Sequence, residues 1–300
     1  MLRPLFENRG RPRPGARRIR HGARKWRRLG LVKRLDLRSP LLFAIAIALL
    51  PGCRHLPEAP QELDELCGYL FQHANDEPED LTIEAGAINL DAWLDINIDA
   101  TAEGYSVNTL SDDAVNALDD GDRSLDGVKG AAVGYTSEND LETLMSTLVS
   151  ASPADMYPDE YLSFQRTWNG DPDCFAAGDC DSLEAESFST LSLPAGIQAD
   201  VDSMVQYRWV DTEDFGRIAV QRTWMHVPPT LNVTWLTVDQ QYYVWMFIPN
   251  NDAGGSRSIQ ATWMVASFLG TAPPEDFVLN TVVSSMQGNS TGLDDWIASH

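Results

Sequence analysis

The sequence predicts an α+β fold in which a helical N-terminal part packs on a C-terminal antiparallel β-sheet closed by a C-terminal helix. Three observations predict it. Apolar residues recur at helical spacing between residues 62 and 150. From residue 158 onward, β-branched and aromatic residues alternate in runs that turn residues separate. After Pro274 the helical spacing returns, so 62–300 is expected to form a single domain, with the sheet and terminal helix over 158–298.

The helical part begins with an apolar face that includes Leu66 and Phe71, followed by helices whose starts carry capping residues. Ser111 is the expected N-cap of a short helix, and Asn139 or Asp140 that of the next one. The small residues of 130–135 predict a strand or a closely packed backbone segment. The expected helices cover 61–74, 78–95, a short segment after Ser111, and 140–149.

The sheet part reads as successive antiparallel strands, which predict a meander with one face packed on a core. The clearest hairpin joins 203–211 to 216–226. A terminal helix is expected to start at Pro273 and to stop at Gly288, before a short helix over 291–298. The expected strands cover 160–168, 184–193, 203–211, 216–226, 231–238, 241–248 and 258–269.

An apolar segment of ten residues, Leu41 to Leu50, precedes this domain and follows a basic flank. It is half as long as the ~20 residues of a transmembrane helix and matches the apolar region of a secretory signal peptide. The next residues, Leu50-Pro51-Gly52-Cys53, resemble the lipobox of bacterial lipoproteins, although Pro51 departs from its usual small residue. The resemblance implies cleavage after Gly52 and a lipid anchor on Cys53. A buried apolar helix and a plain secretory cleavage site are the alternatives.

The resemblance also fixes the expected organisation and location. Residues 1–52 are a disordered basic leader plus signal peptide that is removed, and 53–61 form a tether. The long leader either contains a twin-arginine-like signal at Arg27-Arg28 or lies upstream of the true translation start. The mature protein is expected in the bacterial cell envelope, in the outer membrane rather than the inner one, facing the periplasm or the exterior.

The balance of charge reverses at Cys53. Residues 1–52 hold 14 of the 22 basic residues and two of the 44 acidic ones. The remaining 53–300 therefore hold 8 basic and 42 acidic residues, a formal net charge of −34. Such a surface repels nucleic acid, so no nucleic-acid partner is expected, and it suits a saline, calcium-rich or extracytoplasmic setting.

The remaining cysteines predict one disulfide. Cys174 and Cys180 flank a short loop, and an oxidising compartment favours a bond between them, with a pair of metal thiolates as the alternative. Cys67 lies on an apolar helix face and is expected to be a buried free thiol.

Acidic residues around that loop are weak Ca²⁺ candidates, because hard oxygen ligands are crowded there. Their spacing does not match an EF-hand, and an acidic solvated turn is the competing interpretation, so no metal is expected. The candidates are Asp171, Asp173, Asp179 and Asp181.

The sequence contains no S-x-x-K, H-E-x-x-H or P-loop pattern. We therefore expect no catalytic residue and no cofactor, while an enzyme of a class without a recognisable motif stays open.

Aromatic residues are dense on the expected strands, where they serve as core and cross-strand pairs or line a ligand site. A run of antiparallel strands that ends in a helix is similar to the START-like, helix-grip superfamily, over about 140–300. That resemblance rests on element order and implies a ligand cavity between sheet and helix. The candidate ligand-binding residues are Trp209, Arg222, Trp224, Trp245 and Trp263.

The expected function is therefore that of a membrane-anchored, non-enzymatic lipoprotein that binds a hydrophobic or aromatic small molecule in a Trp/Tyr-lined sheet. The alternative is a structural or assembly lipoprotein that binds another envelope protein.

The lipobox interpretation predicts the mass of the mature N-terminus. Protein purified from membranes should yield an N-terminal peptide that starts at Cys53 and carries acyl chains, and Cys53→Ala should abolish membrane retention. An unmodified Cys53, or a mature chain that starts elsewhere, contradicts the prediction.

Overall fold

The computed structural model describes residues 55–75, 80–118, 123–251, 253–271 and 275–300. The signal-peptide and Cys53 predictions lie outside these residues. Within them, no helix is both long enough and apolar enough to cross a membrane.

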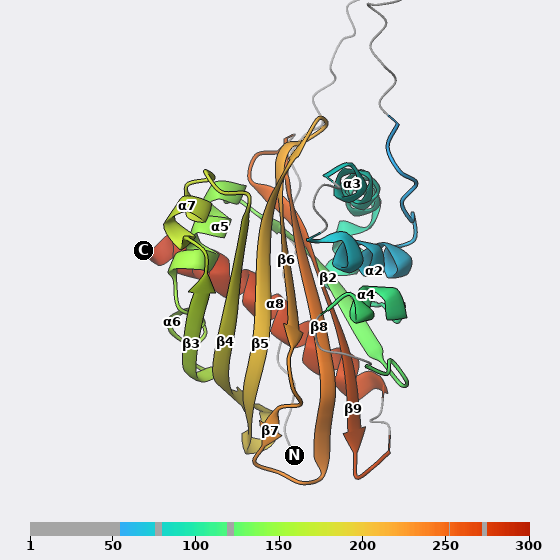
Figure 1. Ribbon diagram of the computed structural model, residues 1–300, viewed down its shortest axis with the longest axis vertical. Coiled ribbons are helices and arrows are strands. Elements are labelled where there is room, and N and C mark those ends of the chain that lie inside the picture. Colours follow the sequence, from blue (N-terminus) through green and yellow to red (C-terminus); the bar gives the residue numbers. More distant parts are fainter. Residues whose placement is uncertain (1–54, 76–79, 119–122, 252, 272–274) are drawn as a thin grey trace, which may run out of the picture. The chain divides into compact units, whose positions relative to one another are not determined.

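The centre of the described part is a nine-stranded antiparallel sheet with the order β1-β2-β9-β8-β6-β5-β4-β3, and β7 pairs with β5 (Figure 1). Strands β3 to β9 follow one another along the chain, whereas β2 comes from the N-terminal part and pairs with β9. The strands are β1 Tyr105–Ser106, β2 Lys129–Ser137, β3 Tyr161–Asn169, β4 Ser182–Leu193, β5 Ile197–Thr212, β6 Gly216–Met225, β7 Thr230–Leu231, β8 Leu236–Pro249 and β9 Ser256–Phe268.

Helices accompany the sheet on both faces, which confirms the α+β class. The helix after β9, α8, runs diagonally across the sheet in Figure 1. A short 3₁₀ turn, Pro194–Gly196, links β4 to β5. The helices are α2 Leu63–His73, α3 Asp80–Ala102, α4 Asp112–Asn116, α5 Leu141–Ser150, α6 Pro153–Met156, α7 Pro172–Ala176 and α8 Glu275–Ser299.

The expectation that one sheet face packs on a core is wrong, because both faces do. Successive residues of a strand point to opposite faces. On β8, Val244 and Met246 pack with the buried face of α2, α3 and α4, whereas Trp245 and Phe247 pack with α5, α7 and the end of α8. We call these the α2 face and the α8 face.

The expected helix starts are confirmed. The Ser111 hydroxyl accepts a hydrogen bond from the Ala114 amide at 3.0 Å, and Asp140 accepts one from the Thr143 amide at 2.8 Å. The segment 130–135 is part of a strand, β2. Helix α3 continues to Ala102 instead of ending at residue 95, and α6 and α7 were not expected.

The expected division into strands at 231–238 and 241–248 is wrong, because β8 runs without a break over Leu236–Pro249 and Thr230–Leu231 forms a separate short strand, β7. A register irregularity lies between Val238 and Gln240, where the two expected strands would have been separated. Such a bulge bends a strand without ending it.

The expected stop at Gly288 is also wrong, because α8 is continuous. Its glycines serve packing instead. A Cβ at Gly292 would lie 2.5 Å from the ring of Tyr157, and one at Gly288 would lie 3.2 Å from the Glu160 carboxylate. The two glycines therefore let α8 approach the segment between α6 and β3 closely.

Helix α8 is held by both ends of the curved sheet. On one side Val282 and Met286 pack against Ala131 and Val133 of β2. On the other side the Tyr157 hydroxyl, ahead of β3, donates to the Asn289 carbonyl at 2.9 Å. This is the arrangement of sheet and terminal helix that the element order predicted.

The two glycines make a matched pair of variants. Gly292→Ala should lower the free energy of unfolding by roughly 1–3 kcal/mol, because the Tyr157 ring, whose hydroxyl is hydrogen-bonded, cannot move freely. Gly288→Ala meets only the flexible end of Glu160, so it should be neutral or stabilise by up to about 1 kcal/mol. Denaturant titration measures both, and equal effects would contradict the packing role.

Candidate functional site

A cavity of about 760 Å³ lies between α8 and the α8 face of the sheet. Its walls come from α5, α6, strands β3, β4, β5, β6 and β8, and the polar side of α8. Ser284 and Ser285 of α8 line it and are exposed, so the cavity opens to solvent.

The cavity exists because short polar side chains face one another across it. Ser189, Ser203 and Thr223 line it from the strands. Ser284 and Ser285 line it from the helix. On either side, bulky apolar residues such as Leu293 and Met286 close the gap between helix and sheet. Close packing is the rule in protein interiors, so a gap of this size that short side chains leave open points to an occupant.

Aromatic side chains also line the cavity. Tyr207 is the cross-strand partner of Gln221, and Gln221 that of Trp245, so the three share the α8 face. Tyr243, two residues before Trp245, lies on the same face. With Tyr157 and Tyr161 on the opposite side, the cavity is bordered by rings as well as by hydroxyl groups.

Burial raises the pKa of three of these tyrosines. Desolvation, reinforced by the nearby Glu160 carboxylate, raises the pKa of Tyr161 to about 12. Desolvation also raises the pKa of Tyr157 and that of Tyr243 well above the ordinary value. The Tyr157 hydroxyl donates to the Asn289 carbonyl and the Tyr243 hydroxyl to the Gln260 side chain, each at 2.9 Å.

One carboxyl group in the wall is also perturbed. Burial, followed by the charge of Asp159, raises the pKa of Glu160. Asp159 itself is exposed at the cavity wall.

The five candidate ligand residues do not form one site, because strand alternation divides them between the two faces. Trp245 lines the cavity. Trp263 is fully buried on the α2 face, 5.9 Å from the ring of Phe71. Arg222 lies on the α2 face too, where its guanidinium donates to Gln206 at 2.6 Å. Trp224 borders the cavity, but its ring belongs to the α2-face core beside Arg222.

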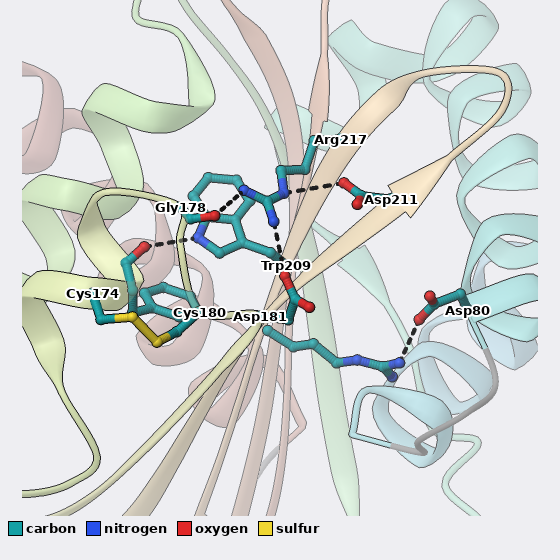
Figure 2. Close-up of polar contacts among 10 residues, drawn as sticks. Asp80, Cys174, Gly178, Cys180, Asp181, Trp209, Asp211 and Arg217 are labelled. Carbon is teal, nitrogen blue, oxygen red and sulfur yellow. Dashed lines mark hydrogen bonds and ion pairs between the residues drawn. A yellow bond between two sulfur atoms is a disulfide. The ribbon is translucent and has the colours of Figure 1, made fainter.

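Trp209 lies on the α8 face but is locked into the structure (Figure 2). Its indole N–H donates to the Phe175 carbonyl at 3.1 Å, and its ring stacks on that of Phe175. Arg217 covers the ring and donates to the Gly178 carbonyl at 2.7 Å. The expected Trp209 ligand contact is therefore replaced by a structural one.

The predicted disulfide is confirmed: Cys174 and Cys180 are bonded, with a Cα–Cα distance of 5.4 Å. Cys67 is confirmed as a buried free thiol, and burial raises its pKa.

The acidic residues around the disulfide have structural partners. Asp171 caps α7 by accepting from the Asp173 and Cys174 amides, and Asp181 forms an ion pair with Arg217 at 2.8 Å, as Figure 2 shows. Over the described ranges, no group of three or more His, Cys, Asp or Glu side chains is placed to hold a metal ion. The Ca²⁺ candidates, which include Asp179, are therefore not brought together.

Sequence reasoning missed Arg166, Gln221 and the polar side of α8, all of which line the cavity. A signal for Arg166 was present, because it alternates with Phe164 and Trp168 on β3 and so shares their inward face. No local pattern marks the other residues.

No protein-family model and no curated protein matches the sequence. Solved structures with a similar course include Ara h 8.0201 (14% identity, 58% of this chain, 99% of that chain, TM-score 0.35). A second is the di-domain ARO/CYC BexL of the BE-7585A biosynthetic pathway (12% identity, 71% of this chain, 62% of that chain, TM-score 0.38). A third is a START superfamily protein from Mycobacterium smegmatis (9% identity, 57% of this chain, 97% of that chain, TM-score 0.34). At these values the similarities assign no function to the chain.

The raised pKa of Tyr161 predicts a loss of stability at alkaline pH. The unfolded chain releases this proton near pH 10 and the folded protein near pH 12. The contribution of Tyr161 is therefore complete below pH 10 and is lost as the pH rises towards 12, at up to about 1.4 kcal/mol per pH unit. Tyr161→Phe should reduce this loss in denaturant titrations across that range, and an unchanged loss contradicts the prediction.

Proposed function

We propose that the protein is a lipid-anchored envelope protein that binds a small aromatic or otherwise hydrophobic molecule between α8 and the sheet, without catalysis. The observation that carries the proposal is the open cavity of about 760 Å³ beneath α8. Ligand sites in proteins typically measure about 300–1,000 Å³ and combine aromatic walls with a few polar groups.

The walls favour a flat ligand. Tyr157, Tyr161, Tyr207 and Tyr243 offer ring faces and edges, and Trp245 adds the largest ring. Aromatic rings bind other rings by offset or edge-on contacts, beyond the free energy of area burial. The serine and threonine hydroxyl groups of the wall carry no charge, and they would bind polar substituents of a ligand.

The proposed location rests on the segment ahead of the domain. The lipobox-like Leu50-Pro51-Gly52-Cys53 would fix the chain to a membrane, and the residues that follow lead into α2 at Leu63. A cavity that opens to solvent on such a domain would take up its ligand from the periplasm or the exterior.

The test is a cavity-blocking variant. Ser285 is exposed at the cavity mouth, so Ser285→Trp should fill the mouth without disturbing the core. Binding of N-phenyl-1-naphthylamine, followed by its fluorescence, should weaken at least tenfold in this variant.

The matched control is Ala298→Trp, which adds the same ring at an exposed position of α8 outside the cavity. It should bind the probe as the unmodified protein does. Equal binding by both variants, or none by the unmodified protein, would falsify the proposed function.

A further inference from the structure

If the cavity is a ligand site, as proposed above, the chemistry of its wall indicates which class of ligand it binds. The main indication is Arg166, the one basic residue among the described residues of the cavity wall. It lies on β3, and its guanidinium covers the rings of Trp168 and Phe164 at 4.7 and 4.9 Å.

Arg166 has no carboxylate partner among the described residues, unlike other arginines of the chain. Arg208 pairs with Asp80 at 2.5 Å, Arg217 pairs with Asp181, and Arg257 pairs with two aspartates. Arg166 instead donates from Nη1 to the Leu148 carbonyl at 3.0 Å. A neutral carbonyl orients the guanidinium but leaves its charge uncompensated.

Three cavity-wall residues each have a buried polar atom without a hydrogen-bond partner. These atoms are Nε of Arg166, Nε1 of Trp245 and Oε1 of Gln221. Leaving a buried polar atom unpaired costs free energy, so native structures seldom do so without a reason. A ligand that supplied the missing partners would recover that free energy.

The unpartnered atoms lie at two ends of the cavity. Gln221 and Trp245 are cross-strand partners on β6 and β8, so an acceptor and a donor come from neighbouring residues there. A hydroxyl group is able to donate to the first and to accept from the second. Arg166 lies on β3, with β4, β5 and β6 between it and β8.

Acidic groups near Arg166 do not replace a ligand anion. Asp159 is exposed to solvent, which screens its charge. Glu160 lies beside Gly288 of α8, where a Cβ would meet its carboxylate at 3.2 Å, and no ion pair joins it to Arg166.

We propose that the ligand is an elongated aromatic acid with a hydroxyl group at its far end. The carboxylate accepts hydrogen bonds from Arg166, the rings lie among the tyrosines, and the hydroxyl group bridges Gln221 and Trp245.

Three probes of one shape test this assignment: 4'-hydroxybiphenyl-4-carboxylic acid, the corresponding carboxamide, and biphenyl-4-carboxylic acid. Their dissociation constants are measured by titration calorimetry at one fixed ionic strength. The hydroxy acid should bind about tenfold more tightly than the carboxamide, as expected for a charge-assisted hydrogen bond. It should also bind more tightly than the acid that lacks the hydroxyl group.

Two variants assign these preferences to residues. Arg166→Gln should remove the preference for acid over carboxamide, and Gln221→Leu should remove only the preference for the hydroxyl group. Lys129→Gln removes the same charge as Arg166→Gln at a residue outside the cavity and should change neither preference. If a variant fails to fold, the three dissociation constants of the unmodified protein still show whether it prefers the carboxylate and the hydroxyl group.

Equal binding of the three probes to the unmodified protein overturns the ligand chemistry and leaves cavity binding intact. Preferences that survive Arg166→Gln and Gln221→Leu overturn the residue assignment. Absence of binding by all three probes overturns this inference, and the binding of N-phenyl-1-naphthylamine then decides whether the proposed function stands.

Discussion

The position of α8 over the sheet depends on one buried side chain, Gln260 of β9. Its amide group donates to the Met286 carbonyl at 2.9 Å and to the Ser290 hydroxyl, and its carbonyl accepts from the Tyr243 hydroxyl at 2.9 Å. A buried amide with all these partners is costly to displace, because any shift leaves a polar group unpaired. Gln260 therefore holds the helix at a fixed distance and orients Tyr243 in the cavity wall.

The two faces of the sheet differ in packing, although the same alternation of side chains along the strands produces both. On the α2 face, large rings such as those of Phe71, Tyr242 and Trp263 meet edge to face and leave no room. On the α8 face, serines and threonines alternate with the rings, and α8 presents its polar side. The α2 face is therefore filled by side chains, whereas the α8 face combines a core with the space for a ligand.

The fold class and most elements follow from the sequence because periodicity and capping are local properties. Ser111 and Asp140 mark helix starts by themselves, and the alternation of Val205, Tyr207 and Trp209 marks one strand. The predicted helix end at Gly288 was wrong because glycine both ends helices and permits close packing. Only the position of Glu160, which the sequence does not reveal, shows that Gly288 serves packing.

The site was less predictable, because a cavity arises from what is missing between distant residues. Nothing near Ser203 in the sequence shows that Ser284 lies across from it. Tryptophan density drew attention to Trp263 and Trp209, whose rings are core, and away from Arg166 and Gln221. Register across several strands and the placement of α8 decide which residues meet.

The central claim is that the space beneath α8 is a ligand site and the other aromatic clusters are core. Fluorine NMR of protein labelled with 5-fluorotryptophan, with each signal assigned by a Trp→Phe variant, tests it most directly. On addition of 4'-hydroxybiphenyl-4-carboxylic acid, the signal of Trp245 should shift strongly while those of Trp209 and Trp263 stay in place. Shifts at Trp209 and Trp263 with none at Trp245 would contradict the claim.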